Sequence, residues 1–63
     1  GDYLLARDYL LNAMADNPNP EMLWLGVRLE RVLGDKDAEA SYAQLLKNKY
    51  PNSEQTKALL AGQ

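Results

Sequence analysis

Apolar side chains recur at three- and four-residue steps along most of the chain, and short groups of proline, glycine and asparagine interrupt them. This spacing places apolar side chains on one face of an α-helix. The first predicted helix runs from about residue 2 to residue 16, and its stripe comprises Tyr3, Ala6, Tyr9, Leu10, Ala13 and Met14. Prolines at positions 18 and 20 end this helix, because proline has no N–H to donate and restricts the residue before it.

The second predicted helix spans residues 20–33, and its boundaries carry their own signals. Asn19 is a suitable N-cap, and Pro20 suits the first helical position. Gly34 suits the left-handed conformation just past a helix end. The apolar stripe of this helix comprises Met22, Leu25, Gly26, Leu29 and Leu33.

A third helix is predicted over residues 36–49 and a fourth, shorter one from Ser53, its cap, to about residue 61. The third stripe comprises Ala38, Tyr42, Leu45 and Leu46, whereas Leu59 and Leu60 anchor the fourth helix. No segment shows clean period-two alternation, so no β-sheet is expected. The pattern therefore predicts an all-α chain of about four helices.

The chain also repeats itself at a spacing of 33 residues. Gly1-Asp2 falls on Gly34-Asp35, Tyr9 on Tyr42, and Pro18-Asn19 on Pro51-Asn52. Helices of about 14 residues with very short connections must run antiparallel to their neighbours. Repetition at this period indicates a helix–turn–helix solenoid.

These features resemble tetratricopeptide repeats. Gly1-Asp2-Tyr3 is similar to the turn inside such a repeat, and the small, large and terminating positions that follow are Ala6, Leu10, Ala13 and Pro18. Trp24 and Ala40 fit the same pattern when the next repeat is counted at a period of 34 residues. The resemblance implies a single C-terminal solenoid unit over residues 1–63. Residues 1–19 would be the second helix of a repeat whose first helix lies upstream, residues 20–50 one full repeat, and residues 53–62 a closing helix.

A narrower resemblance covers roughly residues 22 to 60. Its matching segments are Leu25-Gly26-Val27-Arg28-Leu29, Gly34 through Tyr42, Gln44-Leu45, and Tyr50-Pro51-Asn52-Ser53-Glu54. They are similar to the end of the type IV pilus biogenesis/stability lipoproteins, the PilF/PilW-like pilotins. The resemblance implies an outer-membrane lipoprotein on the periplasmic side that helps the pilus secretin assemble. The lipidated cysteine of that family is not in this chain, so the resemblance assigns membrane anchoring to no residue here.

Composition narrows the possible chemistry. The 63 residues include no Cys and no His, which excludes disulfides, thiol nucleophiles, histidine bases and Cys/His metal sites. Seven Lys and Arg against nine Asp and Glu leave a net charge of −2, so nothing points to nucleic acid. Asp35, Asp37 and Glu39 complement a helix dipole and lack the EF-hand order, so no metal or cofactor is predicted. An enzyme or a ligand-binding bundle is the third class considered, and the lack of reactive residues argues against it.

Trp24 is the main candidate for partner binding, together with Val27, Arg28 and Arg31. Tryptophan and arginine are enriched in interface hot spots, and an indole can stack under a guanidinium. Core packing is the favoured alternative for Trp24, because a helix inside a solenoid packs on two neighbours. Tyr9 and Tyr42 are also predicted in the core.

Leu4, Leu11 and Ala15 lie away from the main stripe of the first helix. They are the predicted seat of the upstream helix, and without that helix the chain is expected to self-associate through this face. Gly26 lies within the apolar stripe of the second helix, where an alanine would stabilise the helix by about 1 kcal/mol more than glycine does. We therefore expect a neighbouring helix to approach closely at Gly26.

The function predicted from the sequence is a non-catalytic protein-interaction scaffold in type IV pilus biogenesis, with a secretin or another assembly component as partner. The alternative is a generic tetratricopeptide adaptor that binds a peptide or partner helix, in which case the cytoplasm is the expected compartment. No membrane contact is expected from these residues, since no apolar run approaches the length of a membrane span.

Overall fold

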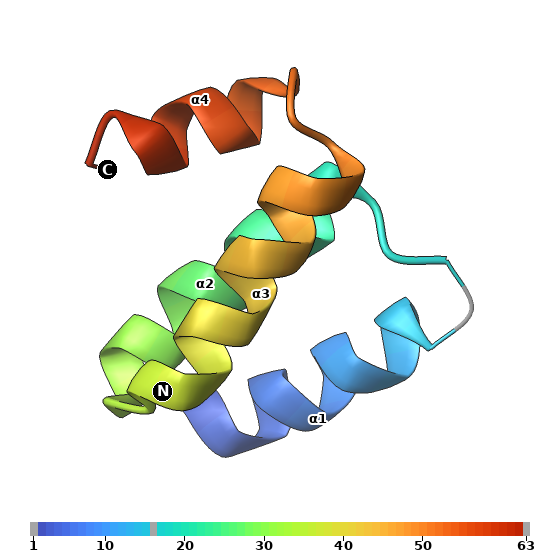
Figure 1. The fold of residues 1–63 in the computed structure, drawn as a ribbon. Helices are drawn as coiled ribbons and strands as arrows, with labels where there is room; N and C mark the ends of the chain where they lie inside the picture. The colour runs from blue at the N-terminus through green and yellow to red at the C-terminus, as the bar shows by residue number, and fades with distance from the viewer. Residues whose placement is uncertain (1, 16, 63) are drawn as a thin grey trace.

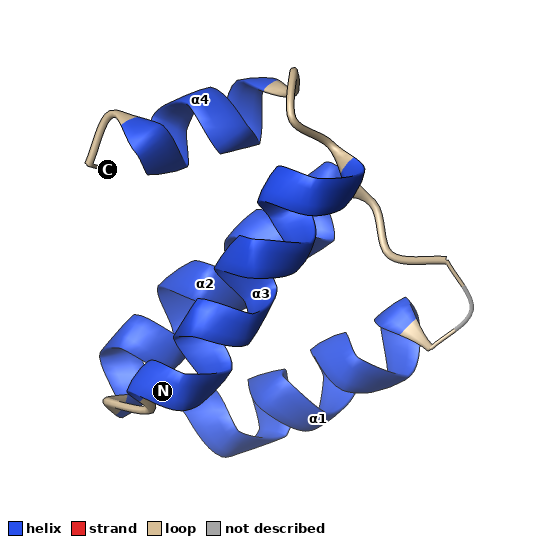
Figure 2. Ribbon diagram, in the orientation of Figure 1, coloured by secondary structure: helices blue, strands red, loops and turns tan. Residues whose placement is uncertain are grey.

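Four helices follow one another in the structure, a computed structural model that describes residues 2–15 and 17–62 (Figure 1). Their bounds are α1 Tyr3–Met14, α2 Pro20–Leu33, α3 Lys36–Lys49 and α4 Glu54–Leu60. No β-strand occurs in these described ranges (Figure 2), so the predicted all-α fold is confirmed. The predicted bounds of α2 and α3 match the observed ones. Gly1 and the predicted end of the first helix at Asp16 lie outside the described residues.

Local hydrogen bonds explain where each helix begins. The side chains of Asp2, Asn19, Asp35 and Ser53 each accept a backbone N–H three residues ahead, at 3.1, 2.8, 3.0 and 3.1 Å. Each bond satisfies one of the N–H groups that a helix start leaves without a partner. Gly34 follows α2 in the left-handed conformation, with φ of 78°. The caps predicted at Asn19, Gly34 and Ser53 are therefore confirmed.

Consecutive helices run in roughly opposite directions (Figure 1). Helices α2 and α3 lie side by side, with α1 near the turn that joins them and α4 across their other end. Helix α4 contacts both α2 and α3, whereas α1 contacts α2. This arrangement is consistent with part of an all-α helical repeat.

Hydrophobic side chains from α1, α2 and α3 form one core cluster. Its buried members are Leu10, Met14, Leu23, Leu29 and Leu46, and half-buried side chains, including Leu59 of α4, pack around them. Two polar contacts close the cluster near the α3–α4 turn. The Tyr50 hydroxyl donates to the Pro18 carbonyl oxygen at 2.6 Å, and the buried Thr56 hydroxyl donates to the Tyr50 carbonyl oxygen at 2.6 Å.

The predicted stripe of the first helix is only partly buried. Leu10 and Met14 are in the core, but Tyr3, Ala6 and Ala13 are exposed and Tyr9 is 76% exposed. The prediction that Tyr9 belongs to the core is therefore wrong. Among the described residues α1 packs on α2 alone, so a single narrow side of it is covered.

The buried face of α2 is rotated from the predicted one. Leu25 is 53% exposed, whereas Leu23, Val27 and Glu30 are fully buried. The reason is that α2 contacts three helices, so its covered surface is set by where those neighbours lie. In α3, Leu46 is buried but Leu45 is 40% exposed.

Gly26 of α2 faces the side chain of Tyr42 on α3. A Cβ atom added at Gly26 would lie 3.0 Å from Cγ and Cδ2 of the Tyr42 ring. Real Cβ atoms rarely come that close to another side chain. The expected close approach at Gly26 is therefore confirmed, and Tyr42 of α3 is the residue that makes it.

Candidate interaction surface

An ion pair between a partly exposed arginine and a buried glutamate joins α1 to α2. Glu30 of α2 has a side chain that is only 1% exposed, and Arg7 of α1 reaches it with two hydrogen bonds. Arg7 Nε donates to Glu30 Oε2 at 3.0 Å and Nη2 donates to Oε1 at 2.6 Å. Two parallel bonds between guanidinium and carboxylate fix orientation as well as distance. The pair therefore sets how α1 sits on α2.

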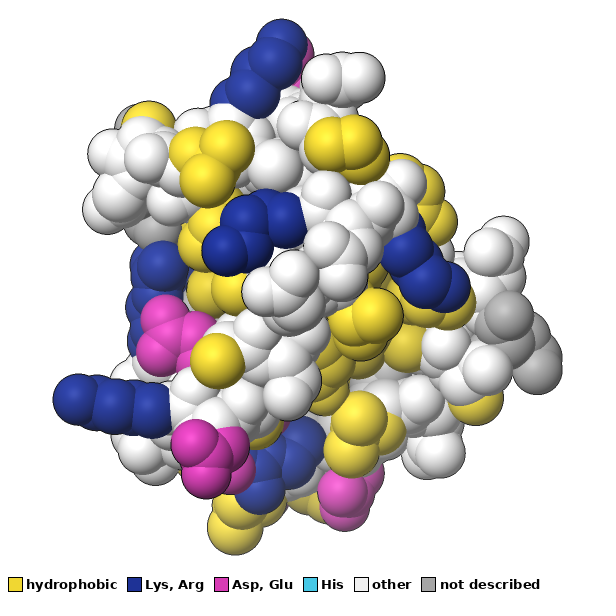
Figure 3. Space-filling model, viewed as in Figure 1, with side chains coloured by type: hydrophobic (Ala, Val, Ile, Leu, Met, Phe, Trp, Pro, Cys, Tyr) yellow, Lys and Arg dark blue, Asp and Glu magenta, His cyan; other side chains and the backbone are white. Residues whose placement is uncertain are grey.

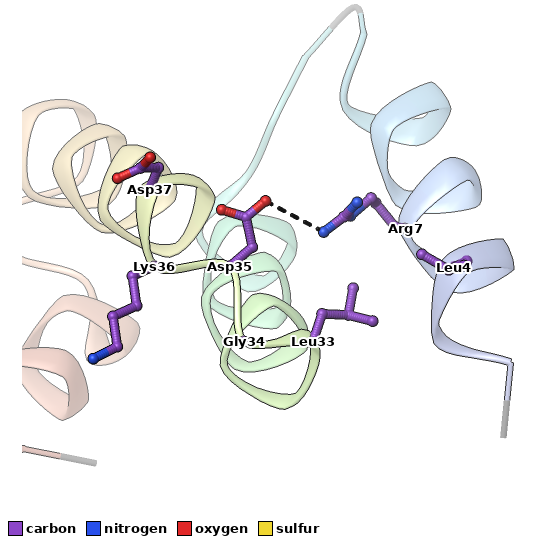
Figure 4. Close-up of a pocket in the computed structure, with 7 residues that line it drawn as sticks. All are labelled: Leu4, Arg7, Leu33, Gly34, Asp35, Lys36 and Asp37. Carbon is purple, nitrogen blue, oxygen red and sulfur yellow. Dashed lines mark ion pairs between the residues drawn. The ribbon is translucent and has the colours of Figure 1, made fainter.

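A shallow hollow surrounds the outer side of this pair (Figure 4). Arg7 and Asp35 point toward one another across it, with 3.5 Å between Arg7 Nη2 and Asp35 Oδ2. The hydrogen bond to Glu30 raises the pKa of Arg7 above its usual value, so this guanidinium stays charged. The arginine therefore faces two carboxylates, Glu30 and Asp35, at this hollow.

The charges of the same ion pair act on the phenol of Tyr42 in α3 and change its pKa. Burial raises the pKa of Tyr42 above its ordinary value of 10.0, and the negative charge of Glu30 raises it further. Arg7 lowers it in part. The ring is therefore held in its neutral form where it contacts Gly26.

The raised pKa of Tyr42 predicts a loss of stability in alkali. An unfolded tyrosine ionises near pH 10, before the folded one does, so the unfolded state loses its proton first. Stability from neutral Tyr42 is complete below pH 10 and falls as the pH rises above it. Urea unfolding at pH 9 and pH 11 should show a smaller loss for Tyr42→Phe than for the parent chain. Equal losses in the two proteins would contradict the assignment.

Trp24 contacts both the core and an arginine of its own helix. The indole is half-buried and packs against the core cluster, as the core interpretation predicted. The Arg31 guanidinium lies 5.6 Å from the centre of the indole ring, within the range of a cation–π contact. Arg31 Nε also donates to Glu39 Oε2 of α3 at 2.6 Å. Trp24 and Arg31 therefore form a braced pair at the surface of α2.

The other two residues predicted to bind a partner, Val27 and Arg28, differ in exposure. Val27 is 0% exposed and belongs to the interior, so a partner cannot touch it in this structure. Arg28 is exposed and lies with Arg31 on a shallow hollow of about 410 Å³. The apolar side chains that line this hollow are Tyr3, Leu25, Leu29 and Val32. Arginines beside exposed apolar side chains form a surface suited to protein contact.

Another hollow lies between α1 and α2, and it shares Leu25 and Leu29 with the hollow beside Arg28. It has a volume of about 210 Å³ and is lined by Ala6, Tyr9, Leu10, Leu25 and Leu29. We call this the α1–α2 groove. Every residue that lines it is apolar apart from the hydroxyl of Tyr9. Such a surface attracts apolar side chains and offers little to an ion or a polar metabolite.

The predicted seat of the upstream helix does not coincide with the α1–α2 groove. Leu4, Leu11 and Ala15 are all exposed. Leu4 lies beside Arg7 on the rim of the charged hollow (Figure 4), whereas the residues that line the groove include none of these three. Figure 3 shows further hydrophobic side chains at the surface between α3 and α1, interrupted by charged ones.

Sequence reasoning missed both the α1–α2 groove and the Arg7–Glu30 pair. Glu30 was overlooked because a charged residue is expected in solvent. A usable signal was its position four residues after Gly26 and three after Val27, on one helical face. The groove depends on how α1 and α2 pack against each other. The apolar stripe of each helix, taken alone, does not indicate that arrangement.

The described residues hold no group of three or more Asp, Glu, His or Cys side chains that could bind a metal ion. Within that same part of the chain, no helix has the length and apolar character needed to span a bilayer.

Comparison with known proteins gives one informative similarity. The chain is 43% identical over 53 residues to the type IV pilus assembly protein PilF of Pseudomonas aeruginosa. The matched region covers 82% of this chain and 21% of that protein. No family model matches the chain, and no solved structure matches it. The chain is thus similar to a short part of a pilus assembly protein.

Proposed function

We propose that this chain is a non-catalytic scaffold in type IV pilus biogenesis, built as the C-terminal part of a tetratricopeptide solenoid. In this proposal residues 1–19 supply the second helix of one repeat, residues 20–50 a full repeat and residues 53–62 a closing helix. The periplasmic side of the outer membrane is the proposed location, and the proposed partner is the pilus secretin or another assembly component.

The similarity to the P. aeruginosa pilus assembly protein carries this proposal, since 43% identity extends over most of the chain. The surface supports a binding role over catalysis. Arg28 and the braced Trp24–Arg31 pair lie on α2, next to exposed Leu25. Arginine and tryptophan are the side chains over-represented in interface hot spots.

Binding to the purified secretin encoded in the same genome tests the proposal. We expect the chain to bind, and Arg28→Glu to weaken binding about ten-fold, because it reverses a charge on the proposed face. Lys47→Glu makes the same charge change on α3 and should leave the affinity unchanged. Isothermal titration calorimetry gives all three affinities. Absence of binding by the parent chain would contradict the secretin assignment and favour a generic adaptor.

We also expect the chain to self-associate through α1 at high protein concentration. Leu4 and Leu11 are exposed, and burying a leucine side chain contributes roughly 1.5–3 kcal/mol. The double variant Leu4→Glu with Leu11→Lys should be monomeric with unchanged helix content. Analytical ultracentrifugation and circular dichroism measure these properties. A parent chain that remains monomeric would show that this face does not drive association.

A further inference from the structure

The hollow beside Arg28 combines positive charge with exposed apolar side chains. The residues that line it are Tyr3, Leu25, Arg28, Leu29, Arg31 and Val32. No carboxylate is among these six described residues. Leu25 is 53% and Val32 59% exposed, so a molecule that docks here touches both of them. We call this surface the Arg28 hollow.

Arg28 differs in its ionic contacts from the other two arginines of the chain. Arg7 Nη2 lies 2.6 Å from Glu30 Oε1. Arg31 Nε lies 2.6 Å from Glu39 Oε2. Arg28 is exposed and forms no ion pair with a carboxylate in the part of the chain that the structure describes. Of the three arginines, Arg28 is therefore the one whose charge a carboxylate from another molecule can balance.

Arg31 adds to the positive potential around Arg28. Helix positions three residues apart are neighbours on the helix surface, where like charges repel each other. Glu39 offsets part of the charge of Arg31, and the indole ring of Trp24 lies 5.6 Å from its guanidinium. A carboxylate beside Arg28 relieves the repulsion that remains, so the Arg28 hollow favours an anionic group over a neutral one.

Apolar side chains lie on both sides of Arg28 along α2. Leu25 precedes it by three residues and Val32 follows it by four, which places all three on one side of the helix. With a rise of about 1.5 Å per residue, Leu25 and Val32 are about 4.5 Å and about 6 Å from Arg28 along the helix axis. A molecule with its negative charge at Arg28 therefore covers apolar surface in both directions.

We propose that the Arg28 hollow binds a segment of another protein in which one acidic side chain lies between two apolar ones. The carboxylate pairs with Arg28, and the apolar side chains cover Leu25 and Val32. Charge complementarity selects this occupant. A basic or uncharged segment would remove water from Arg28 and leave its charge without a partner, which is unfavourable.

This inference rests on the proposed function, because it names the chemistry of the partner for the same face of α2. The two proposals fail in different experiments. A secretin that does not bind would leave the recognition of acidic segments intact. Failure of the peptide experiment described next would leave the pilus role intact and remove only the assigned chemistry.

Two capped pentapeptides test the inference on the 63-residue chain. Acetyl-Leu-Ser-Glu-Ser-Leu-amide carries an acidic side chain between two leucines, and the second peptide has glutamine in place of glutamate. Titration of the isotope-labelled chain, followed by NMR, gives each affinity and the residues affected. We expect chemical-shift changes at the Arg28 hollow. We also expect the glutamate peptide to bind about five-fold more tightly, which is the upper end for an exposed ion pair.

Variants separate the charge of Arg28 from the apolar contacts. Arg28→Gln should remove the preference for the glutamate peptide. Lys47→Gln, which removes an exposed positive charge on α3, should keep it. Leu25→Ser should weaken the binding of both peptides by a similar factor and keep the preference. In the unmodified chain, salt at about 1 M should abolish the preference, because it screens an exposed ion pair.

Several outcomes would overturn the proposal. One is equal affinity of the unmodified chain for the two peptides, and another is a preference that persists in Arg28→Gln. Absence of shift changes at the Arg28 hollow, or changes only around the lysines of α3, would have the same consequence. Signals of the hollow that move with chain concentration before any peptide is added would show that a second copy occupies it, which also overturns the proposal.

Discussion

Gly26→Leu will lower the free energy of unfolding by about 1–3 kcal/mol, the range for overpacking a close contact. A Cβ at this position already lies 3.0 Å from the Tyr42 ring, and the ring is held between α2 and α3. The leucine side chain adds three further carbons in the same direction. The protein is small, so a change of this size removes much of its total stability. Urea unfolding followed by circular dichroism measures it.

Two companion variants separate overpacking from other effects of leucine. Ala40→Leu adds the same side chain on the exposed side of α3 and should change stability by no more than about 0.5 kcal/mol. Combining Gly26→Leu with Tyr42→Ala removes the ring that the leucine meets, so the double variant should lose less than the two single losses added together. Additive losses would mean that Tyr42 is not the obstacle.

Leu46→Ala is expected to be the most damaging truncation in α3, with a loss of about 2–5 kcal/mol in the free energy of unfolding. Leu46 is fully buried in the core cluster formed by α1, α2 and α3. Removing its three outer carbons loses apolar burial and leaves a cavity that the packed neighbours fill only in part. We expect the variant to be largely unfolded at temperatures where the parent chain is folded.

Leu45→Ala is the matched control, because it removes the same atoms from the adjacent residue. Leu45 is 40% exposed, so its truncation should cost less than half as much as that of Leu46. Thermal unfolding of the two variants side by side gives the comparison. Similar losses would mean that α3 is rotated about its axis relative to the structure described here.

The sequence by itself determined the four helices of the described residues and the bounds of α2 and α3. Signals at helix ends are local: an N-cap side chain bonds to a backbone N–H three residues away, and the glycine after α2 needs only its own backbone freedom. Asn19, Gly34 and Ser53 were predicted as caps and act as caps. The sequence also indicates the close approach at Gly26, since glycine inside a helix implies a contact that a larger side chain would block.

The tertiary structure alone decided which apolar residues are buried and where the α1–α2 groove forms. Leu45 and Leu46 are equally apolar, and Tyr9 and Tyr42 occupy matching repeat positions, yet burial differs within each pair. Burial depends on which neighbouring helix covers a given side, and α1 has only α2 beside it in the described residues. A periodic stripe predicts that one face of a helix is covered, whereas the relative placement of several helices determines the side and the extent.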